Sequence, residues 1–237
     1  MKYSIANVSH LYGNNLILSQ LNLEFPVDGI VVVVGPSGSG KSTLLRLLGF
    51  LEEPVHGEIL LSLGEQKYSS SRPERPWPRL TCVFQNRFLW PHLTIRQNIE
   101  LPLRCQNGGG SRRRLDEVIK LFDMSEFENR YPNEVSGGQA QRTALARALA
   151  LNPSMLLIDE AHTGLDVQQI RTLNQHLIHL NDSGIGIVIV THSVDFARKY
   201  GEFFIVMEHG KIVEWGDREV LRRPKSIFLR GAADMGD

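Results

Sequence analysis

The feature that most constrains the fold is the segment Gly35–Thr43, GPSGSGKST, which lies between two regular patterns. Before it, Ile30–Val34 (IVVVV) is a β-branched run typical of a strand buried on both faces of a parallel sheet. After it, KSTLLRLLGFL predicts a helix packed on that strand. A glycine-rich turn in this context can close backbone N–H groups around phosphates, and the helix start adds partial positive charge. We therefore predict an α/β fold with a phosphate-binding loop (P-loop) at Gly35–Thr43, not a turn that binds nothing.

Further strands and helices are predicted on both sides of this loop. Apolar runs at Met155–Asp159 and Ile185–His192 indicate buried strands, and between them Asp166–Leu180 carries apolar residues at helical spacing. The alternating segments Tyr3–Tyr12 and Leu16–Phe25 predict an antiparallel sheet near the N-terminus. A hairpin is expected to turn at His209–Gly210. Strands that alternate with helices are typical of an α/β sheet.

The middle of the chain differs, because residues 94–150 show a mostly helical pattern. One helix places Leu115, Val118, Ile119 and Phe122 on a single face. We expect one nucleotide-binding domain over residues 1–237, with a core of about 1–86 and 151–237. A small helical subdomain at about 87–150 would be inserted into it. Composition predicts loops at Ser69–Pro78 and Asn107–Ser111.

Bulk composition narrows the class of protein. The 26 basic and 26 acidic residues cancel, which gives no global attraction to nucleic acid or to an anionic membrane. No stretch approaches the roughly 20 apolar residues of a membrane span, and the N-terminus lacks the apolar segment of a signal peptide. We therefore expect a protein that is neither exported nor membrane-spanning. Cys82 and Cys105 are expected to be reduced thiols.

Residues beside the P-loop predict phosphate chemistry. Lys41 can reach the β- and γ-phosphates of a nucleotide, and the Ser42 hydroxyl can ligate Mg²⁺. Asp159 ends a buried strand, where it can hold Mg²⁺ through a water molecule. Glu160 follows it, where a base can polarise an attacking water. Alone, Asp159 and Glu160 would be a solvated acidic pair, but a P-loop upstream favours a catalytic role.

A second anion site is predicted at Ser136–Gln139, SGGQ. Gly137 and Gly138 stand at the start of a helix whose Ala140, Ala144, Leu145 and Ala148 can pack inward. Free N–H groups at that start, with the Ser136 hydroxyl, can bind an anion. The sequence thus predicts two phosphate-binding sites, Gly35–Thr43 and Ser136–Gln139.

The order of these motifs resembles the nucleotide-binding subunit of ATP-binding-cassette (ABC) transporters. The order is Tyr12, the P-loop, Gln85, SGGQ, LLIDE, GLD and THS, and the resemblance covers about residues 3–230. SGGQ is the specific part, because other P-loop NTPases lack it; we call Ser136–Gln139 the signature segment. The resemblance implies a P-loop NTPase (RecA-like) α/β core, an N-terminal antiparallel β-subdomain and an inserted α-helical signature subdomain.

The resemblance also implies a role for each matching residue. Tyr12 would stack on adenine, Gln85 would be a Mg²⁺ and water ligand, Glu160 the catalytic base and His192 a γ-phosphate contact. Considered alone, Tyr12 would be a core tyrosine, Gln85 a surface amide and His192 a structural histidine. The implied catalytic residues are Glu160, His192 and Lys41, and the implied metal ligands are Ser42, Gln85 and Asp159. The implied ATP-binding residues are Tyr12, Gly35, Ser37, Gly38, Ser39, Gly40, Lys41, Ser42, Thr43 and Gln85.

In this family the signature segment completes a site on another subunit. Two chains meet head to tail around two ATP molecules, so Ser136, Gly137, Gly138 and Gln139 would bind ATP in trans. Asp166 would lie at the dimer contact. The expected partners are a second cassette, most simply a copy of this chain, transmembrane permease subunits, and a solute-binding protein in the case of import. ATP and Mg²⁺ are the expected cofactors, and no nucleic acid is expected.

Two positions depart from the family pattern. Val135 stands where leucine is usual, and Ala161 and His162 follow Glu160 where proline is usual. Valine keeps an apolar packing position, whereas the loss of proline removes a fixed φ. Because Glu160 and His192 are both present, we expect an active ATPase.

Three classes of function remain to be compared. A soluble ABC ATPase of DNA repair or translation would carry a long coiled coil or two cassettes, and neither pattern occurs here. A kinase or GTPase that shares only the P-loop would not explain SGGQ. A transporter ATPase on the cytoplasmic face of the inner membrane fits best, with Phe88, Leu89, Trp90 and Pro91 as permease contacts or as core residues.

The direction of transport and the solute are less constrained. A separate cassette chain favours import, and the stretches LWPHLT and THSVDFARKYGEFFIVMEHGKIVEWG resemble cassettes of polar-amino-acid uptake. NIELPL also resembles lipoprotein-release and macrolide-type cassettes, so an export-type cassette remains the alternative.

Overall fold

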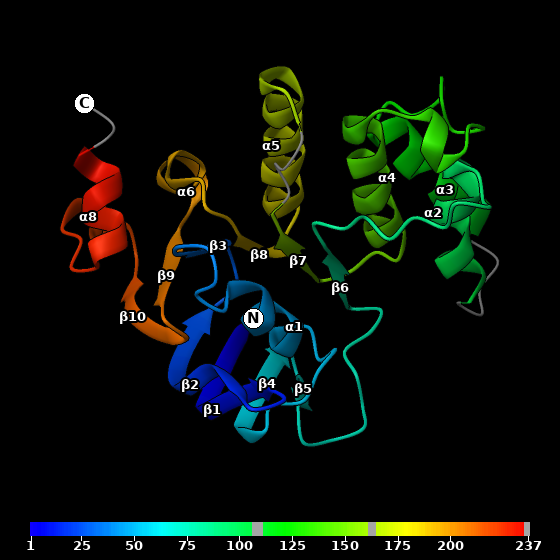
Figure 1. The fold of residues 1–237 in the computed structure, drawn as a ribbon. Helices are drawn as coiled ribbons and strands as arrows, with labels where there is room; N and C mark the ends of the chain where they lie inside the picture. The colour runs from blue at the N-terminus through cyan, green and yellow to red at the C-terminus, as the bar shows by residue number, and fades with distance from the viewer. Residues whose placement is uncertain (106–110, 161–164, 235–237) are drawn as a thin grey trace.

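Two β-sheets share the fold in the computed structural model, which describes residues 1–105, 111–160 and 165–234 (Figure 1). The antiparallel sheet has the order β2-β1-β4-β5, and the larger sheet has the order β10-β9-β3-β8-β7-β6. All neighbours in the larger sheet are parallel except β10, which pairs antiparallel with β9. The strands are β1 (Lys2–Tyr12), β2 (Asn15–Pro26), β3 (Ile30–Val34), β4 (His56–Leu63), β5 (Gln66–Ser69), β6 (Leu80–Val83), β7 (Met155–Asp159), β8 (Gly186–Val190), β9 (Phe203–Glu208) and β10 (Lys211–Gly216).

Strand β3 shows why its sequence is a continuous apolar run. It pairs with β8 on one side and β9 on the other, and all five residues are buried. Val32 and Val34 face one hydrophobic core, whereas Val31 and Val33 face a second core shared with the antiparallel sheet. Because successive side chains point to opposite faces, a strand between two cores has no position for a polar residue. Each buried valine contributes on the order of 1.5–3 kcal/mol.

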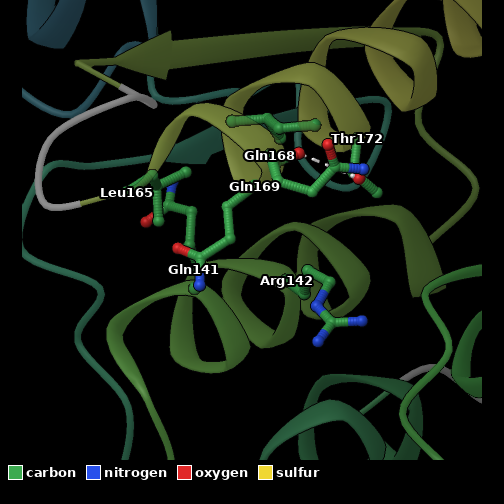
Figure 2. A pocket seen from close by; sticks show the side chains of 8 residues that line it. Gln141, Arg142, Leu165, Gln168, Gln169 and Thr172 are labelled. Carbon is green, nitrogen blue, oxygen red and sulfur yellow. Dashed lines mark hydrogen bonds between the residues drawn. The ribbon is translucent and has the colours of Figure 1, made fainter.

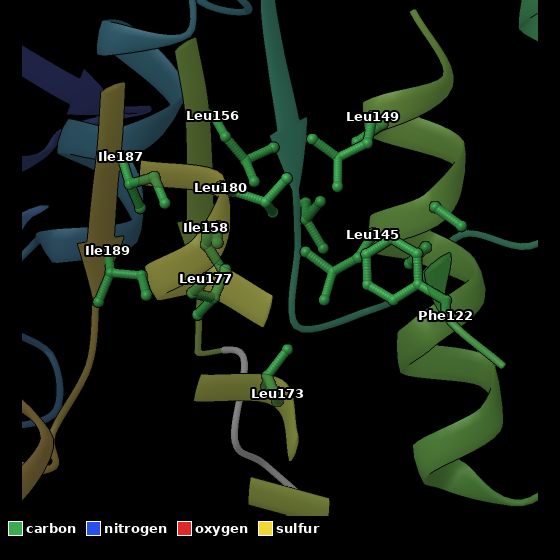
Figure 3. Close-up of a cluster of buried hydrophobic side chains, with 14 of the residues drawn as sticks. Phe122, Leu145, Leu149, Leu156, Ile158, Leu173, Leu177, Leu180, Ile187 and Ile189 are labelled. Atoms are coloured by element: carbon green, nitrogen blue, oxygen red, sulfur yellow. The ribbon is translucent and has the colours of Figure 1, made fainter. Parts of the chain in front are cut away.

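Helices cover the parallel sheet, and one group of them lies to its side. In Figure 1, α2 (Ile95–Arg104), α3 (Ser111–Leu121) and α4 (Gly137–Ala150) gather together, and α5 (Val167–Asp182) stands between them and the rest. Figure 3 shows α5 residues Leu173, Leu177 and Leu180 between sheet residues and the α4 residues Leu145 and Leu149. One core therefore joins the sheet, α5 and α4. The remaining helices are α1 (Lys41–Leu48), a 3₁₀ turn (Pro132–Glu134), α6 (Val194–Tyr200), α7 (Glu219–Arg222) and α8 (Ile227–Asp234).

The turn between β9 and β10 touches both sheets and the P-loop. The Gly210 amide donates to the Ser39 carbonyl at 3.2 Å, and the Gly210 carbonyl accepts from the Ser19 amide at 2.9 Å. A Cβ on Gly210 would lie 2.2 Å from the Ile17 carbonyl oxygen, and one on Gly35 would lie 2.1 Å from the Met207 carbonyl oxygen. These approaches require glycine, so the hairpin tip supports the P-loop directly.

The α/β fold, the N-terminal antiparallel sheet and the hairpin at His209–Gly210 are confirmed. Two predicted elements were too long, because β8 ends at Val190 and α1 ends at Leu48, whose successor Gly49 caps the helix. Strands β4, β5 and β6 were not predicted, and Ser69 belongs to β5, not to a loop. The predicted loop Asn107–Ser111 lies mostly outside the described residues, as do Ala161 and His162. Within the described ranges, no helix combines the length and apolarity needed to cross a bilayer.

Candidate active site

Four strands of the parallel sheet deliver the predicted site residues to one edge. β3 leads into the P-loop, β6 leads to Gln85, β7 ends at Asp159 and β8 is followed by His192. Their carboxyl ends meet because the strands are parallel and adjacent, which is where α/β sheets bind ligands. A cavity of about 510 Å³ opens there. Its lining comprises Ile17, Ser37, Gly38, Gly40, Lys41, Ser42, Thr43, Gln85, Glu160 and His192.

The P-loop keeps its lysine on its own backbone. The Lys41 Nζ donates to the Gly35 carbonyl at 2.9 Å and to the Pro36 carbonyl at 2.8 Å. Burial lowers the Lys41 pKa, although the nearby Glu160 and Asp159 carboxylates act in the opposite direction. Gly38 and Gly40 have φ of +78° and +95°, a region that glycine adopts without strain. The cation is thus already turned into the loop, with the amides of α1 beside it.

Gly35 and Ser39 lie behind the cavity and do not line it. Gly35 packs against the hairpin carbonyl of Met207, and Ser39 is almost fully buried. The Ser39 hydroxyl has no hydrogen-bond partner within the described structure. These two residues therefore shape the loop from below, while Ser37, Gly38 and Gly40 face the open space.

Three oxygen-bearing side chains meet at the predicted metal position. The Ser42 hydroxyl donates to Asp159 Oδ1 at 3.1 Å. Burial raises the Asp159 pKa, and the bond from Ser42 partly offsets this effect. Gln85 lines the same neighbouring cavity of about 300 Å³ as Ser42 and Asp159. A hydroxyl, a carboxylate and an amide oxygen are hard ligands of the kind that Mg²⁺ takes, so the residues fit this ion.

Glu160 and His192 form a contact pair at the mouth of the cavity. Glu160 Oε2 lies 2.7 Å from His192 Nδ1, with 17% of the Glu160 side chain and 68% of the His192 side chain exposed. Glu160 has φ of +53°, which is strained for a residue with a side chain. The Glu160 amide donates to the Val190 carbonyl, which ties this backbone to β8. The orientation of the Glu160 carboxylate is therefore fixed by its backbone bond to β8 and by its contact with His192.

Tyr12 lies at the β1–β2 turn and is held by charged neighbours. Its hydroxyl donates to Glu52 Oε2 at 2.6 Å and accepts from Arg46 Nη1 at 3.2 Å. Its ring meets His10 edge-on with centroids 5.0 Å apart. Tyr12 is 41% exposed, so it is not a core tyrosine, and it does not line the P-loop cavity. Neither Glu52 nor Arg46 was predicted, because both contact Tyr12 across more than 30 residues of sequence.

The signature segment caps its own helix. Ser136 Oγ accepts from the Gln139 amide at 3.2 Å, and Gln139 Oε1 accepts from the Ser136 amide at 2.8 Å. This capping box uses two of the donors at the start of α4 and leaves the amides of Gly137 and Gly138. No residue of the P-loop cavity lining comes from α4, so within one chain the two anion sites stay apart. Val135 packs against the core, as expected of an apolar position.

The start of α5 lies against α4 (Figure 2), and its Gln169 lies beside Gly138 of the signature segment. Asp166 caps α5 by accepting from the Gln169 amide at 2.8 Å, and Gln169 Oε1 accepts from the Asp166 amide at 3.3 Å. A Cβ on Gly138 would lie 2.6 Å from Gln169 Oε1. Gly138 therefore leaves room for the end of the Gln169 side chain, which a larger residue would have to displace. The small pocket of about 140 Å³ between the helices is lined by Gly138, Gln141, Arg142, Leu165, Gln168, Gln169, Thr172 and Leu173.

Comparison with known proteins fits this geometry. Residues 18–163 match the family described as ABC transporter. The chain belongs to this family. The ATP-binding cassette MJ0796, solved as a dimer bound to ADP and Pi, has a TM-score of 0.80 and 34% identity. The match covers 91% of this chain and 98% of that one.

Two relatives are named as ATP-binding proteins of an import system and of a transport system. The sulfate/thiosulfate import ATP-binding protein CysA of Synechocystis is 39% identical over 98% of this chain. The arginine transport ATP-binding protein ArtP of Haemophilus influenzae is 36% identical over 95% of it. The match spans 65% of the length of the former and 96% of the latter. The predicted family, the P-loop α/β fold and an ABC-type ATPase that uses ATP and Mg²⁺ are thereby confirmed.

Several residues of the ABC cassette that support the site were not predicted. Arg87 and Arg147 lie behind Gln85, Gln169 lies behind the signature segment, and Glu52 holds Tyr12. Each makes a contact with a residue distant in sequence, and no local pattern marks that contact.

Proposed function

We propose that this ABC cassette is the ATP-hydrolysing subunit of an importer and works as a pair on a membrane permease. The observation that carries the proposal is the split between two anion sites. One is complete with lysine, metal ligands and base, and the other is a bare helix start on a different part of the same chain. A helix start supplies N–H donors and partial positive charge, and here it would add them to a phosphate that the partner's P-loop holds.

Each predicted residue has a place in this chemistry. Ser42, Asp159 and Gln85 would hold Mg²⁺, which when bound neutralises charge on the β- and γ-phosphates. Lys41 would leave the loop carbonyls for the phosphates. Glu160 would take the proton of the attacking water, and His192, already 2.7 Å from Glu160, would keep that carboxylate aimed. The Tyr12 ring would stack on adenine, and its hydroxyl would stay bonded to Glu52 and Arg46.

The second half of the site would come from the partner cassette. Gly137 and Gly138 would donate their amides, with Ser136 and Gln139, to the γ-phosphate held by the other P-loop. Asp166 would meet the partner near the same contact. Isologous pairing of two copies supplies two such sites at once, and MJ0796 is a solved dimer of this fold.

An apolar groove supports a permease partner. It encloses about 460 Å³, and its lining includes Leu51, Trp77, Phe84, Trp90 and Pro102. Trp77 is 51% exposed and Trp90 is 39% exposed, so Trp90 is not a core residue. Phe88 is exposed beside it. Large apolar side chains on a surface mark interaction sites, and an amphipathic helix of a permease fits a groove of this chemistry.

Import on the cytoplasmic face of the inner membrane follows from the relatives by analogy. Their names include sulfate and arginine, so a small polar or charged solute is the class we propose, with polar amino acids as the first choice. A lipoprotein-release or export-type cassette is less favoured, because the relatives CysA and the Fe(3+) ions protein FbpC are named import ATP-binding proteins.

The Glu160→Gln variant tests the paired site. The amide cannot accept the water proton, so hydrolysis should fall by about 10²–10⁴ while ATP still binds. With MgATP and the permease present, the variant should persist as a closed pair, detected by light scattering and by retained ATP. Glu53→Gln, an exposed carboxylate remote from the cavity, is the control. A Glu160→Gln variant that hydrolysed ATP at the wild-type rate would reject the assignment of the base.

A further inference from the structure

One guanidinium joins the stretch after Gln85 to the signature helix. Arg147 on α4 donates from Nη1 to the Phe88 carbonyl at 2.7 Å and from Nη2 to the Arg87 carbonyl at 2.8 Å. These bonds bridge about 60 residues of sequence. A planar guanidinium that grips two successive carbonyls fixes both position and orientation of that backbone.

The guanidinium that makes these two bonds is partly buried. Burial lowers the Arg147 pKa, and no carboxylate among the described residues forms an ion pair with it. The two carbonyls and the Trp90 ring stabilise its charge instead. The Trp90 ring centroid lies 5.0 Å from Arg147 Cζ. A partly buried cation loses stabilising hydrogen bonds if these partners move away, so Arg147 and the 87–90 backbone should move together.

The gripped backbone is itself strained. Phe88 has φ of +46°, an unusual conformation for an aromatic residue, and its carbonyl is one of the two that Arg147 binds. A second tie lies beside the first, because Arg87 Nε donates to Gln141 Oε1 at 3.2 Å. Gln141 is also on α4 and is almost fully buried. Two α4 side chains thus hold two neighbouring residues of one strained segment.

The two ends of this linkage lead to different sites. Gln85, two residues before Arg87, lines both the P-loop cavity and the metal cavity. Arg147 and Trp90 line the apolar groove. Helix α4 then runs about three turns back from Arg147 to its cap at Ser136. Because a helix of this length behaves as a rigid rod, displacement of the 87–90 backbone displaces the signature segment.

We propose that Arg147 is a positioning residue that couples Gln85 and the groove to the signature segment of the same chain. The proposal rests on the function proposed above, since it assumes that Gln85 responds to MgATP. When MgATP fills the P-loop site, Gln85 moves toward it and shifts the 87–90 backbone. Arg147 transmits this shift to α4. The start of α4 then presents Ser136–Gln139 to the partner. A segment seated in the groove reaches the same guanidinium through Trp90.

Arg142 provides a matched control on the same helix. Its Nη1 donates to the Phe122 carbonyl at 3.0 Å and to the Asp123 carbonyl at 3.4 Å, and its Cζ lies 5.2 Å from the Phe127 ring centroid. The two arginines therefore make the same kinds of bond. Arg142 grips residues that follow α3, and only Arg147 grips the segment after Gln85.

The test is hydrogen exchange on the full chain, with and without MgATP, at concentrations where light scattering shows a monomer. In the wild type, MgATP should slow exchange at residues 35–43 and also change it at 85–90 and 136–140. Arg147→Met should keep the response at 35–43 and lose that at 136–140 by on the order of tenfold, the effect of a lost charged hydrogen bond. Arg147→Lys should restore part of the response, and Arg142→Met should keep it.

The outcomes separate two failures. If MgATP protects nothing at 35–43 in the wild type, the proposed function fails. If residues 35–43 respond in the wild type but residues 136–140 do not, the coupling is overturned and the proposed function stands. The same holds if residues 136–140 respond equally in the wild type and in Arg147→Met. If Arg142→Met and Arg147→Met lose the response equally, Arg147 is merely structural and the proposal is also overturned. Should Arg147→Met not fold, Arg147→Lys against Arg142→Lys gives the same comparison.

Discussion

The P-loop and the signature segment are two helix starts that differ in what surrounds them. The P-loop brings a cation, a hydroxyl and two carboxylates of its own chain, and its lysine already rests on loop carbonyls. The signature segment brings neutral donors only, and its serine and glutamine bond to each other. Under the proposed function, the same element of secondary structure would make one site that binds phosphate alone and another that needs a phosphate already held by the partner. The difference lies in the side chains, since both helices offer the same amides.

Removal of the Lys41 charge should weaken ATP binding by the P-loop of a single chain. Lys41→Met keeps the length of the side chain and loses its donors to phosphate. ATP affinity should fall by about ten- to a hundredfold, because hydrogen bonds to charged groups contribute roughly 1.5–3 kcal/mol. Calorimetric titration of the isolated chain with MgATP measures this. Lys67→Met, on β5, should leave the affinity unchanged; an equal loss in both variants would contradict the assignment.

On the signature side, the contact between Gly138 and Gln169 gives a sharper test. In Gly138→Ala the new methyl group would displace the Gln169 amide and break its bond to the Asp166 amide. The Asp166 side chain still caps α5, and the lost reciprocal bond is worth about 0.5–1.5 kcal/mol. If that loss falls on the contact with the partner, turnover by the pair should fall about two- to tenfold. ATP binding by the single chain should not change.

A double variant shows whether the collision is the cause. Gln169→Ala removes the displaced side chain, so adding Gly138→Ala to it should have little further effect on turnover. If the two losses simply add, the Gly138 position acts through its ligand contact and not through Gln169.

A cap without a ligand role separates stability from function. Thr94 caps α2 with the same capping box that Ser136 makes at α4. Thr94→Ala and Ser136→Ala should each lower the free energy of unfolding by about 1 kcal/mol in urea denaturation. Only Ser136→Ala should also lower turnover beyond what the lost stability explains. Equal turnover in the two variants would remove Ser136 from the trans site.

Acid should weaken the signature side slightly. Burial lowers the pKa of His176 on α5, whose ring lies 4.8 Å from that of Phe122; Asp123 acts in the opposite direction, and Arg142 and His179 add to the lowering. The unfolded chain therefore binds a proton at a pH where the folded chain does not, so stability is lost as pH falls below the ordinary histidine range. Urea midpoints should fall less on acidification in His176→Gln than in the control His179→Gln. A larger fall in His176→Gln would contradict this.

Local motifs were enough to predict the active-site edge, whereas its supports were not predictable. Gly35–Thr43, Asp159 and Glu160 could be found because strand, loop and helix are contiguous there. Strand β6 was missed because LTCV is too short for a periodic signal, although it delivers Gln85. The Arg147 bonds depend on tertiary approach, and nothing near position 147 in the sequence indicates them. The positive φ of Glu160 and Phe88 likewise reflects the surroundings, since neither residue type favours it.

The turn at His209–Gly210 has a consequence for synthesis. The P-loop lies in the first fifth of the chain, but Ser39 and Gly35 rest on a hairpin that the ribosome makes in the last fifth. A nascent chain synthesised as far as α5 would contain every P-loop residue that binds phosphate. It would still lack the β9–β10 hairpin that packs against Gly35 and Ser39. We expect ATP to protect the loop from protease only in chains extended past residue 216, so that nucleotide binding reports completion of the β9–β10 hairpin.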